Sequence, residues 1–169
     1  MDIFDLDVAI RPIAEKVMHQ SEAVSFSYGN EGALILWLGA MNGKQIEKAL
    51  KRKGARKYPL IWLGEGWEGN KQIPGYKFTG VSFYISLNSD VKTLNENREV
   101  NFETLFKIAN DFIAEMKRSK IRIAQESIQW TKRANFTSKD KSHATDIWDT
   151  IMLTMDFIAN TDCFKHIKK

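Results

Sequence analysis

The chain has 169 residues, of which 43% are hydrophobic and 27% are charged, and its formal net charge is +4. This length suits one domain with a real core, so we expect a single domain over residues 1–169. No apolar stretch approaches the roughly 20 residues that span a bilayer. The N-terminus carries Asp2, Asp5 and Asp7 where a signal peptide would have basic residues, which predicts that the protein is not exported. A single cysteine, Cys163, can form neither an internal disulfide nor a cysteine zinc site, and this favours a reducing compartment.

Residues 8–19 follow a helical period, and Pro12 predicts that this N-terminal helix begins near it. Residues 23–29 alternate apolar side chains with serines, which is typical of a half-buried strand. The more continuous apolar run at 32–40 is interpreted as a second strand, joined to the first by a hairpin across the "GNEG" turn. A short helix over 42–54 has one apolar stripe, basic residues on its other faces, and Gly54 at its end.

The second half of the chain predicts strands at 58–63 and 76–89, and a long amphipathic helix at about 101–119 that Asn101 caps. The sheet-facing residues of this helix are expected to be Leu105, Phe106, Ala109, Phe112 and Ile113. Residues 121–144 are polar and mixed, and 150–159 alternate as one last strand. We therefore expect an α+β fold. Its mixed or antiparallel sheet of about five strands is flanked by the N-terminal helix, the short basic helix and the long amphipathic helix.

Gly64, Gly66 and Gly69 have the spacing of a dinucleotide-binding turn. Such a turn needs a following helix that points its N–H groups at the phosphate, but Pro74 interrupts any helix there, and the acidic Glu65 and Glu68 would repel an anion. We expect a hairpin loop that binds no nucleotide. Within it, Trp67 either covers apolar surface or meets a partner, so it is a candidate interface residue.

Seven basic residues lie between positions 44 and 57 against a single acid, Glu47, and further basic stretches occur at 117–122 and 132–141. One interpretation is that these are solvated faces that keep the protein soluble, and the other is that they contact nucleic-acid phosphates. The candidate DNA-facing residues are Lys48, Lys51, Arg52 and Lys53.

The sequence contains no convincing catalytic motif, and we predict no enzyme activity, no cofactor and no metal. The three histidines are scattered, and the one cluster open to metal or acid–base chemistry is His143, Asp146 and Asp149. Arg98 and Glu99, ahead of the long helix, are interpreted either as a solvated pair or as contacts to a neighbouring subunit. Five tryptophans are many for this length, and some are expected to anchor interfaces.

Three segments, "KYPLIWL" (57–63), "GVSFYISLNSDVKTLNENREVNFETLFKIANDFIAEMKRS" (80–119) and "ATDIWDTIMLTMDFIANTDCF" (144–164), resemble structural proteins of crAss-like and related Bacteroidota phages. Their order is similar to the tail-terminator or tail-completion fold. The basic helix at 42–54 and the "GEGWEGN" segment at 64–70 have no counterpart in that pattern.

The resemblance implies a virion structural protein of the head–tail connector or tail, made in the host cytoplasm and assembled as a homo-oligomeric ring. Its implied partners are neighbouring connector, portal or tail proteins, together with DNA that passes through the ring. The alternative from the basic stretches is a small, sequence-independent nucleic-acid-binding module.

Overall fold

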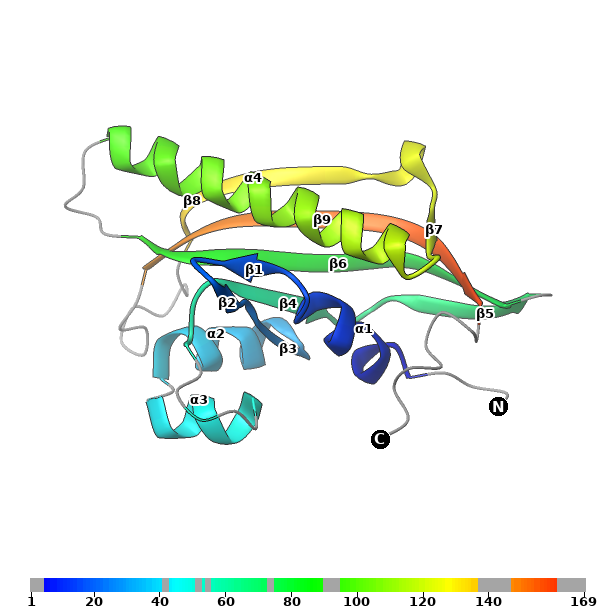
Figure 1. Ribbon diagram of the computed structural model, residues 1–169, viewed down its shortest axis with the longest axis horizontal. Helices are drawn as coiled ribbons and strands as arrows, with labels where there is room; N and C mark the ends of the chain where they lie inside the picture. The colour runs from blue at the N-terminus through cyan, green and yellow to red at the C-terminus, as the bar shows by residue number, and fades with distance from the viewer. Residues whose placement is uncertain are drawn as a thin grey trace.

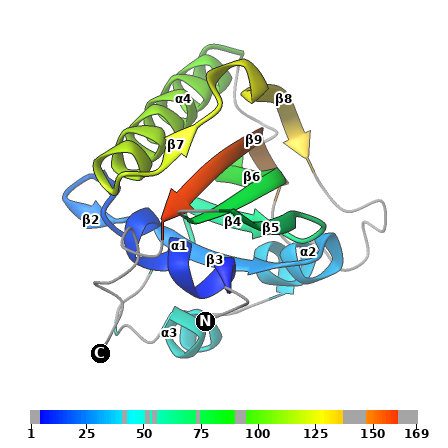
Figure 2. The same ribbon diagram turned by 90° about the vertical axis from the view of Figure 1, so that its right-hand side faces the viewer.

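The protein is described by a computed structural model that covers residues 5–40, 43–50, 53, 56–72, 75–89, 95–136 and 147–160. One large sheet runs through the molecule, and helices lie on both of its faces (Figures 1 and 2). Among the residues described, no helix is both long and apolar enough to cross a membrane.

Within the described ranges, the large sheet has seven strands, and it is mixed. They are β3 (Ser25–Gly29), β4 (Leu60–Gly64), β5 (Glu68–Gln72), β6 (Gly75–Ser89), β7 (Arg122–Ile123), β8 (Gln129–Phe136) and β9 (Ile147–Asn160). The order across the sheet is β3-β4-β6-β9-β7, while β5 pairs with β6 and β8 pairs with β9. Only the β3–β4 pair is parallel among these pairings. The expected α+β class is therefore confirmed, and because β7 and β8 share one side of β9, the sheet is five positions wide.

Side chains of the central strands β6 and β9 alternate between the two faces of the sheet. The two strands therefore separate the hydrophobic cores on these faces. Val81, Phe83 and Ile85 face one side, opposite Met155, Leu153 and Ile151 of β9. The register shifts at a bulge between Phe78 and Val81, where Gly80 adopts a left-handed φ of 67°. The extra residue places Phe78 and Val81 on the same face, so the apolar side of β6 continues through the bulge.

Helices α1 (Leu6–Ala14) and α4 (Asn95–Arg118) cover this apolar face, together with a small hairpin of β1 (Met18–His19) and β2 (Glu22–Ala23). All of these lie on the same side of the sheet in Figure 2. Phe112 of α4 is fully buried, and its ring meets Phe83 edge-on with centroids 4.9 Å apart.

The other face is covered near β3 and β4 by α2 (Glu31–Ala40) and α3 (Gly43–Leu50), around a smaller core rich in tryptophan. The buried members of this core are Leu34, Trp37, Ile46, Leu50, Leu60, Trp62 and Trp148. Trp62 Nε1 donates to the Gly29 carbonyl at 3.0 Å, and Trp148 Nε1 donates to the Tyr58 hydroxyl at 2.7 Å. Three of the five tryptophans are thus core residues.

The predicted strand at 32–40 is wrong, because these residues form helix α2. Asn30 caps it, since its side-chain oxygen accepts the Ala33 N–H at 2.8 Å. A continuous apolar run does not distinguish a strand from a helix buried on one face and packed near a sheet. A parallel β3–β4 pair also needs a crossover connection, which α2 and α3 supply where a hairpin could not.

Two helix boundaries also differ from expectation. Helix α1 begins at Leu6, capped by Asp5, and Pro12 lies in its last turn rather than at its start. Helix α4 begins at Asn95, so Asn101 is not its cap; instead, the Asn101 amide donates to the buried Asp149 carboxylate at 3.0 Å. The other predicted strands and the short basic helix are confirmed, with α3 ending at Leu50 and Gly54 outside the described residues.

Replacing Phe112 with alanine should lower the free energy of unfolding by about 3–5 kcal/mol, because it removes a fully buried ring from contact with Phe83. Chemical denaturation measures the change. Glu103→Ala, at an exposed site on the same helix, is the matched control and should change it by less than about 0.5 kcal/mol. Equal effects of the two substitutions would contradict the packing of α4.

Replacing Asn101 with alanine should cost about 1–3 kcal/mol, because the fully buried Asp149 carboxylate loses one of its donors. Asn110→Ala is the control, since Asn110 is an exposed asparagine on the same helix. If both variants unfold at the same denaturant concentration, the Asn101–Asp149 bond contributes nothing.

Candidate interaction surface

The predicted DNA-facing residues belong to α3 and the segment after it. Lys48 lies in the last turn of α3 and is exposed, and Lys53 is exposed as well. Lys51 and Arg52 lie outside the described residues. Helix α3 lies at the end of the molecule away from α4, beyond the β3 side of the sheet (Figure 1).

The predicted interface residues differ in how far they are exposed. Trp67 is only partly exposed, and its ring packs edge-on against Phe78 with centroids 5.6 Å apart, so much of it covers the core. Glu99 is exposed in the N-terminal part of α4. Arg98 belongs to the same helix, but its side chain lies outside the described residues.

The glycine-rich segment leads into a strand. After Gly66, with φ of 95°, residues Glu68–Gln72 form β5, which pairs antiparallel with β6. The expected hairpin loop is therefore mostly a strand. β4 and β5 both pair with β6, and the glycine-rich segment is the break between these two strands.

The proposed acid–base cluster is described only at Asp149. This carboxylate is fully buried, on the face of β9 that α4 covers, and it accepts the Asn101 bond. His143 and Asp146 lie outside the described residues. Within the described ranges, no group of three His, Cys, Asp or Glu side chains could hold a metal ion.

The sequence did not indicate one surface feature of the described residues, a groove of about 370 Å³ between α4 and β8. It is lined by Phe106, Ala109, Asn110, Ile113, Lys117, Gln125, Ile128, Trp130, Ile151 and Leu153. Trp130 is 62% exposed, although it stands opposite the buried Leu153 in the β8–β9 register. A large aromatic side chain is therefore held beside an apolar groove with most of its surface in water.

The groove exists because the apolar stripe of α4 is wider than the surface the sheet covers. Leu105, Phe112 and Met116 are fully buried against the sheet, whereas Phe106 and Ile113 are partly exposed and line the groove. The expectation that all five predicted residues face the sheet therefore holds only in part. The excess width of the stripe was the sequence signal for this surface.

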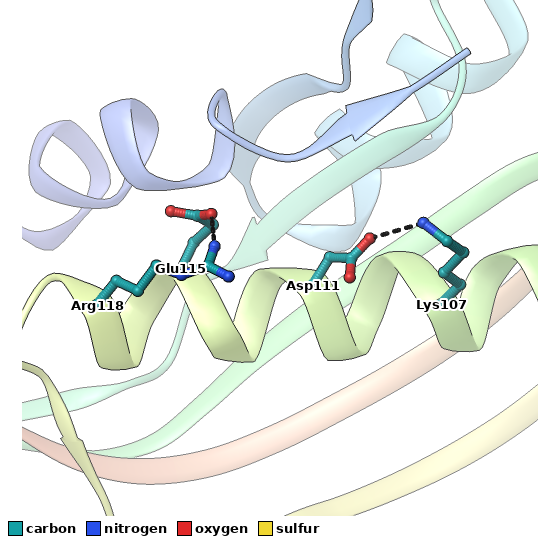
Figure 3. Close-up of polar contacts among 4 residues, drawn as sticks. All are labelled: Lys107, Asp111, Glu115 and Arg118. Carbon is teal, nitrogen blue, oxygen red and sulfur yellow. Dashed lines mark hydrogen bonds and ion pairs between the residues drawn. The ribbon is translucent and has the colours of Figure 1, made fainter. Parts of the chain in front are cut away.

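The opposite flank of α4 carries charges that already have partners. Lys107 bonds Asp111 at 3.0 Å, and Arg118 bonds Glu115, both on the side where β1 and β2 lie (Figure 3). On the groove side, Lys117 contributes to the lining, and Lys132 of β8 places its Nζ 4.4 Å from the centre of the Phe102 ring. The groove thus has basic residues at its border.

An acidic surface lies where α1 begins. Asp5 and Asp7 open the helix, and Glu65 in the turn after β4 is near enough to act on Asp7. The pKa of Asp7 is raised, chiefly by burial and further by the negative charges of Asp5 and Glu65. Val8, beside them, is 50% exposed.

Two other titratable groups are perturbed by their surroundings. Burial, followed by the charges of Arg56 and Lys107, lowers the pKa of His19. Burial, followed by Glu31, raises the pKa of Tyr84, and Arg133 opposes this rise. His19 lies on the β1–β2 hairpin and Tyr84 in the smaller core, so the two are not parts of one site.

Comparison with protein families found no family model that matches the chain, and comparison with curated proteins found no match either.

Replacing the exposed Trp130 with alanine should change the free energy of unfolding by less than about 1 kcal/mol, because most of its surface is already in water. Trp148→Ala is the matched comparison and should cost about 3–5 kcal/mol, since Trp148 is fully buried and bonded to Tyr58. Urea denaturation of both variants checks this. A large loss for Trp130→Ala would mean that this tryptophan serves the core.

Proposed function

We propose that the protein is a structural subunit that assembles with copies of itself into a ring, as a part of a phage head–tail connector or tail. The observation that carries the proposal is the groove between α4 and β8 with the exposed Trp130 on its wall. Tryptophan is enriched at the centres of protein interfaces, where it provides much of the binding energy.

The position of the groove supports assembly. β8 pairs only with β9 among the described strands, so it forms an edge of the sheet, and the groove opens beside that edge. An edge strand with an apolar hollow next to it is a surface that a further subunit can extend. The resemblance of the three segments to phage structural proteins is the second line of support, and it implies a ring at the head–tail junction.

A ring at that junction surrounds DNA, and this gives the basic segments a function. Exposed lysines such as Lys48 and Lys53 would contact phosphates without reading the sequence. Each subunit needs only a weak contact, because many copies act on one duplex. The competing proposal is a nucleic-acid-binding module that acts alone, and it relies on the same basic residues.

Light scattering after size-exclusion chromatography, with electron microscopy of the same fractions, distinguishes the two proposals. A ring-shaped oligomer of defined mass supports the structural subunit, and Trp130→Asp should reduce the oligomer fraction. A monomer that shifts duplex DNA at moderate salt supports the binding module and counts against the ring.

Neutralising Lys48, Lys51, Arg52 and Lys53 together to glutamine should leave the free energy of unfolding within about 1 kcal/mol of wild type, because exposed charges contribute little to stability. DNA retention by assembled particles should fall. The control exchanges lysine and arginine at the same four positions, which keeps the charge and should keep retention. If particles with the neutral variant retain DNA normally, these four residues form a solvated face and do not contact DNA.

A further inference from the structure

The groove borders the flank of α4 that lies away from the chain's own α1. On the opposite flank, α4 already packs beside α1 within the larger core. The groove runs along α4 from Phe106 to Lys117, a distance of about 17 Å at 1.5 Å per residue. Helix α1 has nine residues and is about 14 Å long. Among the residues described, this flank of α4 is therefore long enough for a helix of the size that packs on the other one.

The charge around the groove is basic. Residues 107–133 contain seven basic and three acidic side chains. Two of those acids, Asp111 and Glu115, are bonded to Lys107 and Arg118 on the opposite flank, so five basic residues and one acid, Glu126, remain. Lys117 and Lys132 stand beside the apolar lining.

The charge around the start of α1 is acidic. Residues 5–11 and 64–70 contain the acids Asp5, Asp7, Glu65 and Glu68, and their one basic residue, Arg11, is paired with Glu15 at 3.7 Å. Val8 is the exposed apolar side chain of this surface. After burial, the negative charges of Asp5 and Glu65 also raise the pKa of Asp7, and a basic partner would offset these charges.

The groove and the acidic surface at the start of α1 lie near opposite edges of the sheet. The groove lies at β8, beyond β9, whereas α1 packs against β3 at the other edge. In Figure 2 the groove elements α4 and β8 lie at one end of the molecule, and α1 lies towards the other end. A contact that joins different surfaces of identical copies repeats from copy to copy, and it closes into a ring when the rotation allows.

We propose that the α4–β8 groove of one copy receives α1 of the next copy, with Val8 on the apolar lining and the acidic residues around it facing Lys117 and Lys132. This contact rests on the self-assembly proposed above and specifies which two surfaces make it. It continues one helical layer from copy to copy, in which each α4 lies between its own α1 and the α1 of a neighbour.

Cysteine crosslinking in a Cys163→Ser background tests the contact, even where rings are too weak to survive chromatography. Val8→Cys and Asn110→Cys place exposed thiols on the two surfaces. Under mild oxidation, a chain with both substitutions should give a ladder of covalent oligomers. An equal mixture of the two single variants should stop at dimers of twice the 19.5 kDa chain mass.

The controls separate this contact from its alternatives. Leu36→Cys, on the exposed side of α2, should give no ladder with Asn110→Cys, and adding Trp130→Asp should abolish the dimer in the mixture. A dimer from Asn110→Cys alone would show a two-fold contact between grooves and overturn the proposal. Absence of any crosslink at high protein concentration would also overturn it, leaving the groove to a different partner.

The outcomes also distinguish this contact from the proposed function. Rings that Trp130→Asp weakens, but that give no crosslink between positions 8 and 110, retain the structural subunit and exclude this contact. A ladder from a chain that forms no ring by microscopy retains the contact but contradicts the closed assembly.

Discussion

The pairing of β6 with β9 is the constraint on which the other elements depend. These strands pair at thirteen positions, and each one also supports an outer neighbour, β4 and β5 on one side and β7 and β8 on the other. Because alternate residues of a strand point to opposite faces, this one register decides which side chains meet α4 and which meet the tryptophan-rich core. A slip by one residue would exchange the two sets.

The bulge in β6 keeps its apolar residues on one face of the sheet. In a regular strand without the bulge, Phe78 and Val81 would lie on opposite faces, and one end of β6 would turn its aromatic residues away from the core. The Gly80 N–H, released from the regular ladder, donates to the Asp156 carboxylate at 2.8 Å, and the Asp156 N–H in turn donates to Ser127 Oγ at 2.8 Å. These bonds tie the bulge to the short helix η1 (Gln125–Ser127), directly before Ile128 and Trp130. The local irregularity of β6 therefore helps to fix one wall of the groove.

Local patterns predicted most of the fold, and they failed where long-range context decides. Alternation identified β3, β6 and β9 because one face of each is apolar and the other is polar. The run at 32–40 has no such contrast, and only its pairing context, a parallel β3–β4 crossover, makes it a helix. Asn101 has the chemistry of a cap, but a distant partner, Asp149, uses its amide inside the helix. The groove could not be located from the sequence, since the second apolar row of α4 and the exposure of Trp130 have meaning only once β8 is placed beside the helix.

In the proposed assembly, the edge strand β8 must not pair with arbitrary strands, and it must still offer a specific contact. β8 carries Lys132 and Arg133 next to Trp130, and charged residues on an edge strand discourage pairing with arbitrary strands because their charges would have to be desolvated or opposed. A partner with acidic residues around an apolar side chain is attracted instead. The lysines attract its acidic residues, and the groove accepts its apolar side chain. In the proposed contact, the charge beside the groove would select among partners, and Trp130 would supply the surface to be buried. This division would let a modest apolar groove, with a volume of about 370 Å³, act as a specific contact rather than as a site of aggregation.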